Sequence, residues 1–162
     1  MSEPLISGQF SGREAFAQRL RDALAKAALE GWRELILSDA TFGDWPLQEA
    51  AVLASLHAWA RSGGHLTLLA HSYDELMRGQ PRFVAWRKLW GHVIDARVCR
   101  SVAASDFPSA LWSPSWYLQR LDPVRSSGVC GEDRERRVQV REELNEFIRN
   151  SSPGFPASTL GL

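Results

Sequence analysis

The chain has 162 residues, and its 19 basic and 19 acidic side chains give a formal net charge of zero. A chain of this length is most simply one domain with a single core. Because no overall charge draws it to polyphosphate or to an anionic membrane, any such contact has to be local. No segment approaches the roughly 20 apolar residues of a membrane helix, so we expect a cytoplasmic protein without a membrane contact.

The first 70 residues predict a helix, a strand, a second helix and a second strand. Segment 11–31 has one apolar face, and Ser11 and Glu14 stand at the spacing of a capping box. The runs ELILSD (34–39) and HLTLLA (65–70) predict strands that are buried on both faces. A helix that begins at DWPLQEAAVL joins them, and the short loops predict a parallel pair with a right-handed crossover.

The same alternation continues to residue 100. Ser72 and Glu75 predict a second capping box, and PRFVAWRKLWG (81–91) predicts a helix with Pro at its start. The apolar face of that helix consists of Phe83, Trp86 and Trp90. HVIDARV (92–98) then predicts a third strand, which extends the α/β pattern.

The pattern changes after residue 100. PSALWSPSWYLQRL (108–121) predicts two antiparallel strands around the turn SPS. The charged segment 131–150 predicts a helix, and 151–162 has too much Pro, Gly and Ser for regular structure. The inward face of this helix is expected to be Val140, Leu144, Phe147 and Ile148. We therefore predict one three-layer α/β/α domain over residues 1–150, with a mixed sheet, a parallel βαβ core, an added antiparallel strand pair and a C-terminal tail.

Across residues 11–150, the element order and the segments ELILSD, HLTLLA, VIDARV and SALW resemble one half of a phospholipase D-like fold. Enzymes of that superfamily carry an H-x-K-x-x-x-x-D motif at the strand that corresponds to SALW. This chain has Phe107, Ser109 and Pro114 at the His, Lys and Asp positions. The resemblance therefore implies the fold without the activity. The chain also resembles uncharacterised bacterial proteins with a DWPL loop and an LGL ending.

Asp39 and His71 each follow a predicted parallel strand. Open α/β sheets bind ligands at these strand ends, so two neighbouring strands would turn both side chains into one crevice. Asp39, His71 and Asp74 are the candidate catalytic residues of a small hydrolase or a metal-dependent enzyme. The alternative is that Asp39 closes an Asx turn with ATFG and that His71 belongs to a cap in HSYDE.

Asp44, Trp45 and Tyr73 are candidate binding residues around this crevice. Asp44 has a structural alternative, because it precedes Pro46 at the expected helix start, where a carboxylate caps the helix. The sequence has neither a glycine-rich phosphate loop nor the ligand spacing of a zinc site, so we expect no cofactor and no metal. Cys99 and Cys130 are expected to be free, buried thiols.

Arg82, Arg87 and Lys88 interleave with aromatic residues in a pattern that fits single-stranded nucleic acid. The same spacing fits a buried helical face with solvated cations, so a nucleic-acid partner is not expected. Trp112, Trp116 and Tyr117 flank a proline turn and are the candidate interface residues of a protein contact.

Single-half phospholipase D-like chains pair, so the resemblance implies a homodimer at this aromatic segment. The alternative is that the last helix covers the segment within one chain. The function that these observations favour is a non-catalytic, phospholipase D-like binding or interaction module whose biological role the residues do not indicate. The alternative function is the small hydrolase or metal-dependent enzyme at the Asp39 and His71 crevice.

Overall fold

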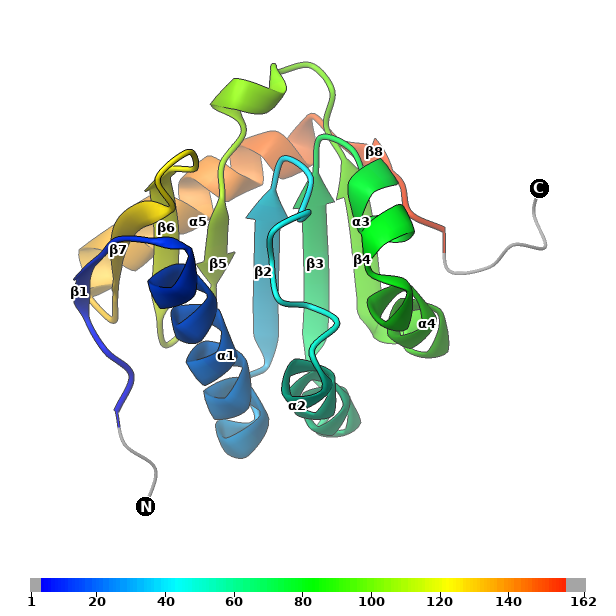
Figure 1. Ribbon diagram of the computed structural model, residues 1–162, viewed down its shortest axis with the longest axis horizontal. Helices are drawn as coiled ribbons and strands as arrows, with labels where there is room; N and C mark the ends of the chain where they lie inside the picture. The colour runs from blue at the N-terminus through cyan, green and yellow to red at the C-terminus, as the bar shows by residue number, and fades with distance from the viewer. Residues whose placement is uncertain (1–3, 157–162) are drawn as a thin grey trace.

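The computed structural model describes residues 4–156, which form five α-helices and one mixed sheet of eight strands (Figure 1). The strands are β1 (Gly8–Phe10), β2 (Glu34–Asp39), β3 (His65–Ala70), β4 (Ile94–Val98), β5 (Ala110–Trp112), β6 (Tyr117–Asp122), β7 (Ser127–Gly131) and β8 (Ser152–Pro153). The helices are α1 (Arg13–Glu30), α2 (Ala50–Arg61), α3 (Asp74–Gly79), α4 (Pro81–Leu89) and α5 (Arg134–Arg149). The strand order is β1-β7-β6-β5-β2-β3-β4-β8.

The sheet lies between two helical layers. Helices α1 to α4 cover one face, and α5 lies on the opposite face (Figure 1). One apolar cluster joins the first face to residues such as Phe16, Leu56 and Phe83, and a second joins the other face to Val140 and Leu144 of α5. The α/β class predicted from alternating strand and helix patterns is therefore confirmed.

The centre of the sheet is parallel and both of its sides are antiparallel. Strand β2 pairs in parallel with β3 from Glu34↔His65 to Asp39↔Ala70, and β3 pairs in parallel with β4. The predicted strand–helix–strand unit is therefore present. Strand β5 pairs antiparallel with both β2 and β6, and β6 continues antiparallel to β7. The predicted antiparallel pair around SPS is confirmed as β5 and β6.

Three strands have no counterpart in the sequence prediction: β1, β7 and β8. The expectation of no regular structure after residue 150 was wrong for Ser152–Pro153, which pairs antiparallel with β4. The tail is ordered by tertiary contacts, because Phe155 is buried against Tyr73 and Phe83. The remainder of the predicted tail, residues 157–162, lies outside the described residues.

Three predicted helix starts were wrong. The N-cap of α3 is Tyr73 and no side chain caps this helix, so Ser72 and Glu75 do not form the second capping box. Gly12, with φ of 101°, is the N-cap of α1 and no side chain caps the helix, so Ser11 does not form the expected capping box. Helix α2 begins at Ala50 rather than near Pro46, because the preceding residues form two turns. In the first, the Trp45 N–H donates to the Phe42 carbonyl, and in the second the Glu49 N–H donates to the Pro46 carbonyl. None of the helices in residues 4–156 is long and apolar enough to cross a membrane.

The aromatic residues expected at a dimer interface are inside the chain. Trp112, Trp116 and Tyr117 are all buried. The Trp112 indole donates to the carbonyl of Arg137 on α5 at 2.9 Å, and the Trp116 indole donates to the carbonyl of Ile6 at 3.3 Å. The homodimer inference is corrected accordingly: it needed an exposed aromatic patch, and α5 and the N-terminal segment cover these side chains within one chain.

Helix α4 also departs from its prediction. Phe83 and Trp86 are buried as expected, but Arg87 is buried too instead of lying on the solvated side. Its Nε and one terminal nitrogen donate to the carbonyl of Phe155. Cys99 and Cys130 are free and buried, as predicted.

Candidate functional site

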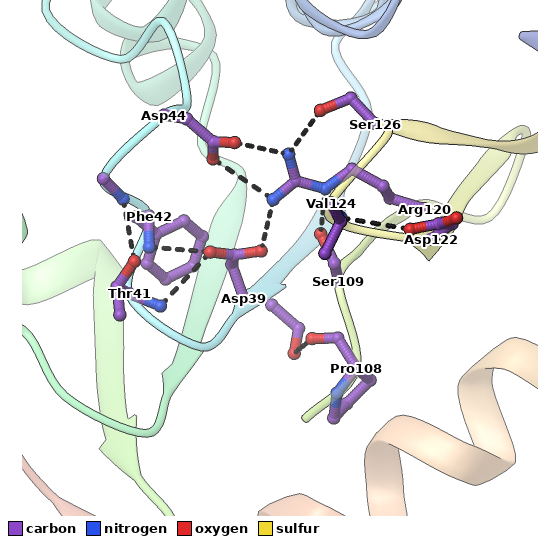
Figure 2. Close-up of polar contacts among 12 residues, drawn as sticks. Asp39, Thr41, Phe42, Asp44, Pro108, Ser109, Arg120, Asp122, Val124 and Ser126 are labelled. Carbon is purple, nitrogen blue, oxygen red and sulfur yellow. Dashed lines mark hydrogen bonds and ion pairs between the residues drawn. The ribbon is translucent and has the colours of Figure 1, made fainter. Parts of the chain in front are cut away.

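A buried ionic cluster lies at the carboxyl end of β2, where three neighbouring strands meet. Asp39 ends β2, Ser109 immediately precedes β5, and Arg120 belongs to β6. Because β5 stands between β2 and β6 in the sheet, Arg120 reaches over its neighbour to meet Asp39. Asp44, in the loop after β2, completes the cluster (Figure 2).

Arg120 is the centre of this cluster, and its side chain is 3% exposed. Nε donates to Ser109 Oγ at 3.0 Å. One terminal nitrogen donates to Asp44 at 2.7 Å and to Ser126 Oγ at 3.3 Å, and the other donates to Asp39 at 2.9 Å and to Asp44 at 3.1 Å (Figure 2). A guanidinium has five N–H groups, so every donor of Arg120 has a partner.

Asp39 also has a hydrogen-bond partner at each of its two oxygens. Its Oδ1 accepts from Arg120, and its Oδ2 accepts from the backbone N–H groups of Thr41 at 3.2 Å and Phe42 at 2.8 Å. The backbone bonds form the Asx turn that the sequence offered as the structural alternative. They hold Phe42 at a φ of 58°, which a residue with a side chain rarely adopts. Asp39 therefore fixes the loop and neutralises Arg120 at the same time.

Asp44 is the more accessible carboxylate of the cluster, with 32% of its side chain exposed. Both of its oxygens accept from Arg120. The expected role of Asp44 as a helix cap was wrong, because α2 begins six residues later, at Ala50, and Glu49 occupies its N-cap position. Asp44 is instead a partner of a cation that lies 76 residues away in sequence.

The cluster keeps its arginine charged. Burial by itself lowers the pKa of Arg120, but the hydrogen bonds and charges of Asp44 and Asp39 outweigh burial and raise this pKa above its ordinary value. The guanidinium carbon also lies 4.1 Å from the ring centre of Phe16 on α1, in a cation–π contact. Two carboxylates and one guanidinium leave the cluster with one negative formal charge.

The structure does not bring Asp39 and His71 together. Side chains alternate between the faces of a strand, and Asp39 follows Leu37 on the face covered by α1 to α4. His71 is the first residue after β3 and stands two residues after Leu69, which packs on the α5 face. Its ring centroid lies 6.3 Å from that of Phe107, which belongs to the same apolar cluster as Leu69. Asp74 is exposed in the first turn of α3. The expected crevice needed Asp39 and His71 on one face of the sheet, and the structure places them on different faces.

Trp45 and Tyr73, the other candidate binding residues, lie in the apolar core. Trp45 packs edge-on against Phe16 and Phe42. The Tyr73 hydroxyl donates to the carbonyl of Arg97 at 2.9 Å, and burial raises the pKa of Tyr73 well above its usual range. Both side chains support the loops around the site from within.

A pocket of about 540 Å³ opens beside the ionic cluster. Asp39, Asp44 and Arg120 form one wall, and the other sides come from Glu75, the segment before β5 and the turn between β6 and β7. Sequence reasoning missed Arg120, Ser109 and Glu75. The sequence did hold a signal for Arg120. In YLQRLD it stands two residues after Leu118, so both side chains lie on the same buried face of the strand, and a buried arginine needs a carboxylate partner.

Metal binding has no arranged ligand set in the described part of the chain. Within residues 4–156, no group of three or more His, Cys, Asp and Glu side chains is positioned to hold an ion. The carboxylates of Asp39 and Asp44 are instead directed at Arg120 (Figure 2).

The fold and this strand-end pocket define a mixed α/β domain with a pocket at the carboxyl edge of its parallel strands. Among solved structures, the chain is similar to TrmBL2, an archaeal chromatin protein described as having a novel mode of DNA binding. The TM-score is 0.69 at 14% sequence identity. The likeness covers 95% of this chain but 56% of TrmBL2. No family model matches the sequence, and no curated protein matches it.

This comparison corrects three expectations. The chain is similar in structure to TrmBL2, which is not a phospholipase D-like enzyme half, so the phospholipase D-like assignment was wrong. It had rested on element order, which unrelated α/β sheets share. The likeness to bacterial proteins is also not upheld, because TrmBL2 is archaeal. The dismissal of nucleic acid as a partner is corrected too, because it conflicts with a similar structure that is described as binding DNA. A neutral net charge cannot exclude a local DNA contact.

Proposed function

We propose that this chain is a non-catalytic binding module that recognises a partner at the carboxyl end of its sheet. One observation carries the proposal: the two buried members of the polar cluster, Asp39 and Arg120, are hydrogen-bonded to each other and to the chain around them. A general base or a nucleophile needs a lone pair that faces the substrate. Asp39 has both oxygens occupied by Arg120 and by backbone N–H groups, and Arg120 has no free N–H.

The placement of His71 supports the same proposal. Acid–base chemistry between Asp39 and His71 requires hydrogen-bond reach, and the two side chains leave the sheet on opposite faces. The cluster instead holds the 40–49 loop against the end of β6, which shapes one wall of the pocket. A rigid wall of this kind suits recognition, because a preformed surface loses little entropy on binding.

The test compares turnover with folding in two variants. Purified wild type, Asp39→Asn and His71→Ala are assayed against bis-p-nitrophenyl phosphate and p-nitrophenyl acetate with Mg²⁺, Mn²⁺ or Zn²⁺ added. We expect all three proteins to hydrolyse these esters at the background rate, while Asp39→Asn is less stable in urea. Turnover by the wild type that either folded variant abolishes would overturn the proposal.

Double-stranded DNA is a second candidate partner, and the likeness in fold to TrmBL2 favours it. The matched region is 56% of TrmBL2, so DNA binding by this chain is a separate proposal. Of its 19 basic residues, all but Lys26 and Lys88 are arginine, the side chain best suited to bidentate phosphate contacts. Anisotropy of a labelled duplex tests it, and binding that weakens steeply with added salt is the expected result.

A further inference from the structure

A second, smaller pocket adjoins the one beside the ionic cluster. Its volume is about 190 Å³, and both pockets are lined by residues of the segment before β5 and by Arg120 and Pro123. We call the two together the strand-end groove. It runs from Glu75 on α3, past the ionic cluster, to Glu143 on α5.

The groove is acidic. Its lining contains five carboxylates and one cation, which gives five minus one, or four, negative formal charges. The cation is Arg120, whose donors are consumed by its own cluster. The carboxylates are Asp39, Asp44, Glu75, Asp106 and Glu143.

Three of these carboxylates are exposed and have no cation partner within residues 4–156: Glu75, Asp106 and Glu143. Glu75 lies directly over Gly43, where a Cβ atom would come within 2.2 Å of its carboxylate oxygen. Gly43 thus leaves room for this carboxylate at the pocket wall. A surface that gathers unpaired charges of one sign attracts ligands of the other sign.

The groove also has an apolar rim. Val124, at the turn between β6 and β7, is 94% exposed, and Leu121 near the end of β6 is 62% exposed. Leu121 lines the smaller pocket and Val124 the larger one, and Pro123 and the buried Phe107 line both. Figure 2 shows Val124 on the turn that carries it past Arg120. Single exposed apolar residues are ordinary, but two at the rim of one acidic groove form a mixed surface.

We infer that the strand-end groove docks a basic peptide segment of a partner protein. An arginine or lysine side chain enters the larger pocket toward the unpaired carboxylate of Glu75. A neighbouring apolar side chain packs on Leu121 and Val124. This inference rests on the proposed function of a binding module and adds the chemistry of its partner. Phosphate groups would face five carboxylates here, and the one cation of the lining, Arg120, has no N–H left for them, so the groove does not suit DNA.

The decisive experiment measures peptide binding to the full chain by fluorescence anisotropy. The probe is a fluorescein-labelled nonapeptide of alternating arginine and leucine, and its glutamate–leucine counterpart is the control. We expect the basic peptide to bind and the acidic one not to bind. The variant Glu75→Gln/Asp106→Asn/Glu143→Gln removes three exposed charges from the groove and should weaken binding about tenfold or more.

A matched variant separates docking from general attraction. Glu132→Gln/Glu135→Gln/Glu142→Gln removes the same charge from exposed positions that line neither pocket, and binding should change by less than about twofold. Equal weakening in both triple variants would refute the groove. Val124→Ser tests the apolar rim separately, and it should weaken the arginine–leucine peptide more than an arginine–glycine peptide.

The outcomes also separate this inference from the proposed function. Failure of the basic peptide to bind overturns the basic-peptide groove and leaves the binding-module proposal standing. Binding of labelled duplex DNA that the groove variant weakens as much as peptide binding also overturns the inference. Ester hydrolysis that depends on Asp39 or His71 overturns the binding module itself.

Discussion

Two arginines are buried within residues 4–156, and their surroundings differ. Arg120 on β6 meets two carboxylates and uses all five of its N–H groups. Arg87 on α4 donates no hydrogen bond to a carboxylate. Two of its nitrogens donate to the carbonyl of Phe155, and its other terminal nitrogen has no hydrogen-bond partner in the described chain. The ring of Phe155 lies 5.5 Å from the guanidinium carbon.

The difference appears in the pKa values of the two residues. The pKa of Arg120 lies above its ordinary value because Asp44 and Asp39 outweigh the effect of burial. The pKa of Arg87 lies below its ordinary value because burial dominates and Tyr73 and Asp95 offset it only in part. Arg120 thus joins three strands through a compensated charge, whereas Arg87 holds the C-terminal segment and bears an uncompensated cost of burial.

The largest effect is expected when Arg120 is replaced by methionine, which keeps its length and removes its charge. Two carboxylates would lose their partner, and breaking a buried ion pair costs about 3–5 kcal/mol. Urea denaturation measures the loss in the free energy of unfolding. A loss below about 1 kcal/mol would mean that the cluster contributes little to the fold.

Removing Asp44 should cost less than removing Arg120. Arg120 keeps Asp39, Ser109 and Ser126, so Asp44→Ala removes one charge-assisted partner at about 1.5–3 kcal/mol. Asp74→Ala, an exposed carboxylate in the first turn of α3, is the matched control and should change stability by less than about 0.5 kcal/mol. Equal effects of the two variants would contradict the cluster as described.

The free energy of unfolding should fall in alkali because of Tyr73, the buried tyrosine whose charge acts on Arg87. Burial raises the pKa of Tyr73 above the ordinary value of 10.0, so above that pH the unfolded chain loses a proton that the folded chain keeps. The unfolding free energy therefore falls as pH rises, by up to about 1.4 kcal/mol per pH unit. Denaturation of Tyr73→Phe should show a shallower alkaline slope, and an identical slope would refute this assignment.

The smallest effect is expected for Arg87→Met. It relieves an uncompensated buried charge but leaves the Phe155 carbonyl without its donor, and these changes oppose each other. Stability should stay within about 1 kcal/mol of the wild type, in contrast to Arg120→Met. A loss as large as that of Arg120→Met would remove the distinction between the two arginines.

The local patterns of the sequence predicted much of the sheet core. Apolar runs at 34–39 and 65–70, joined by one helix and short loops, determined the parallel pair, because such a unit has few ways to bury both strands. Phe83 and Trp86 stand three residues apart, which fits one face of a helix with 3.6 residues per turn, and this spacing predicted their burial. The Asx turn at Asp39 was also a valid alternative from local sequence alone.

Only the tertiary structure decided the partners of charged residues. Arg120 lies 81 residues from Asp39, and nothing in the local pattern of either residue specifies the other. The faces of Asp39 and His71 depended on strand register, in which a shift of one residue reverses every side chain. The edge strands β1 and β8 form because β7 and β4 offer unpaired backbone groups. Long-range pairing of this kind depends on the whole sheet, which a single sequence does not display.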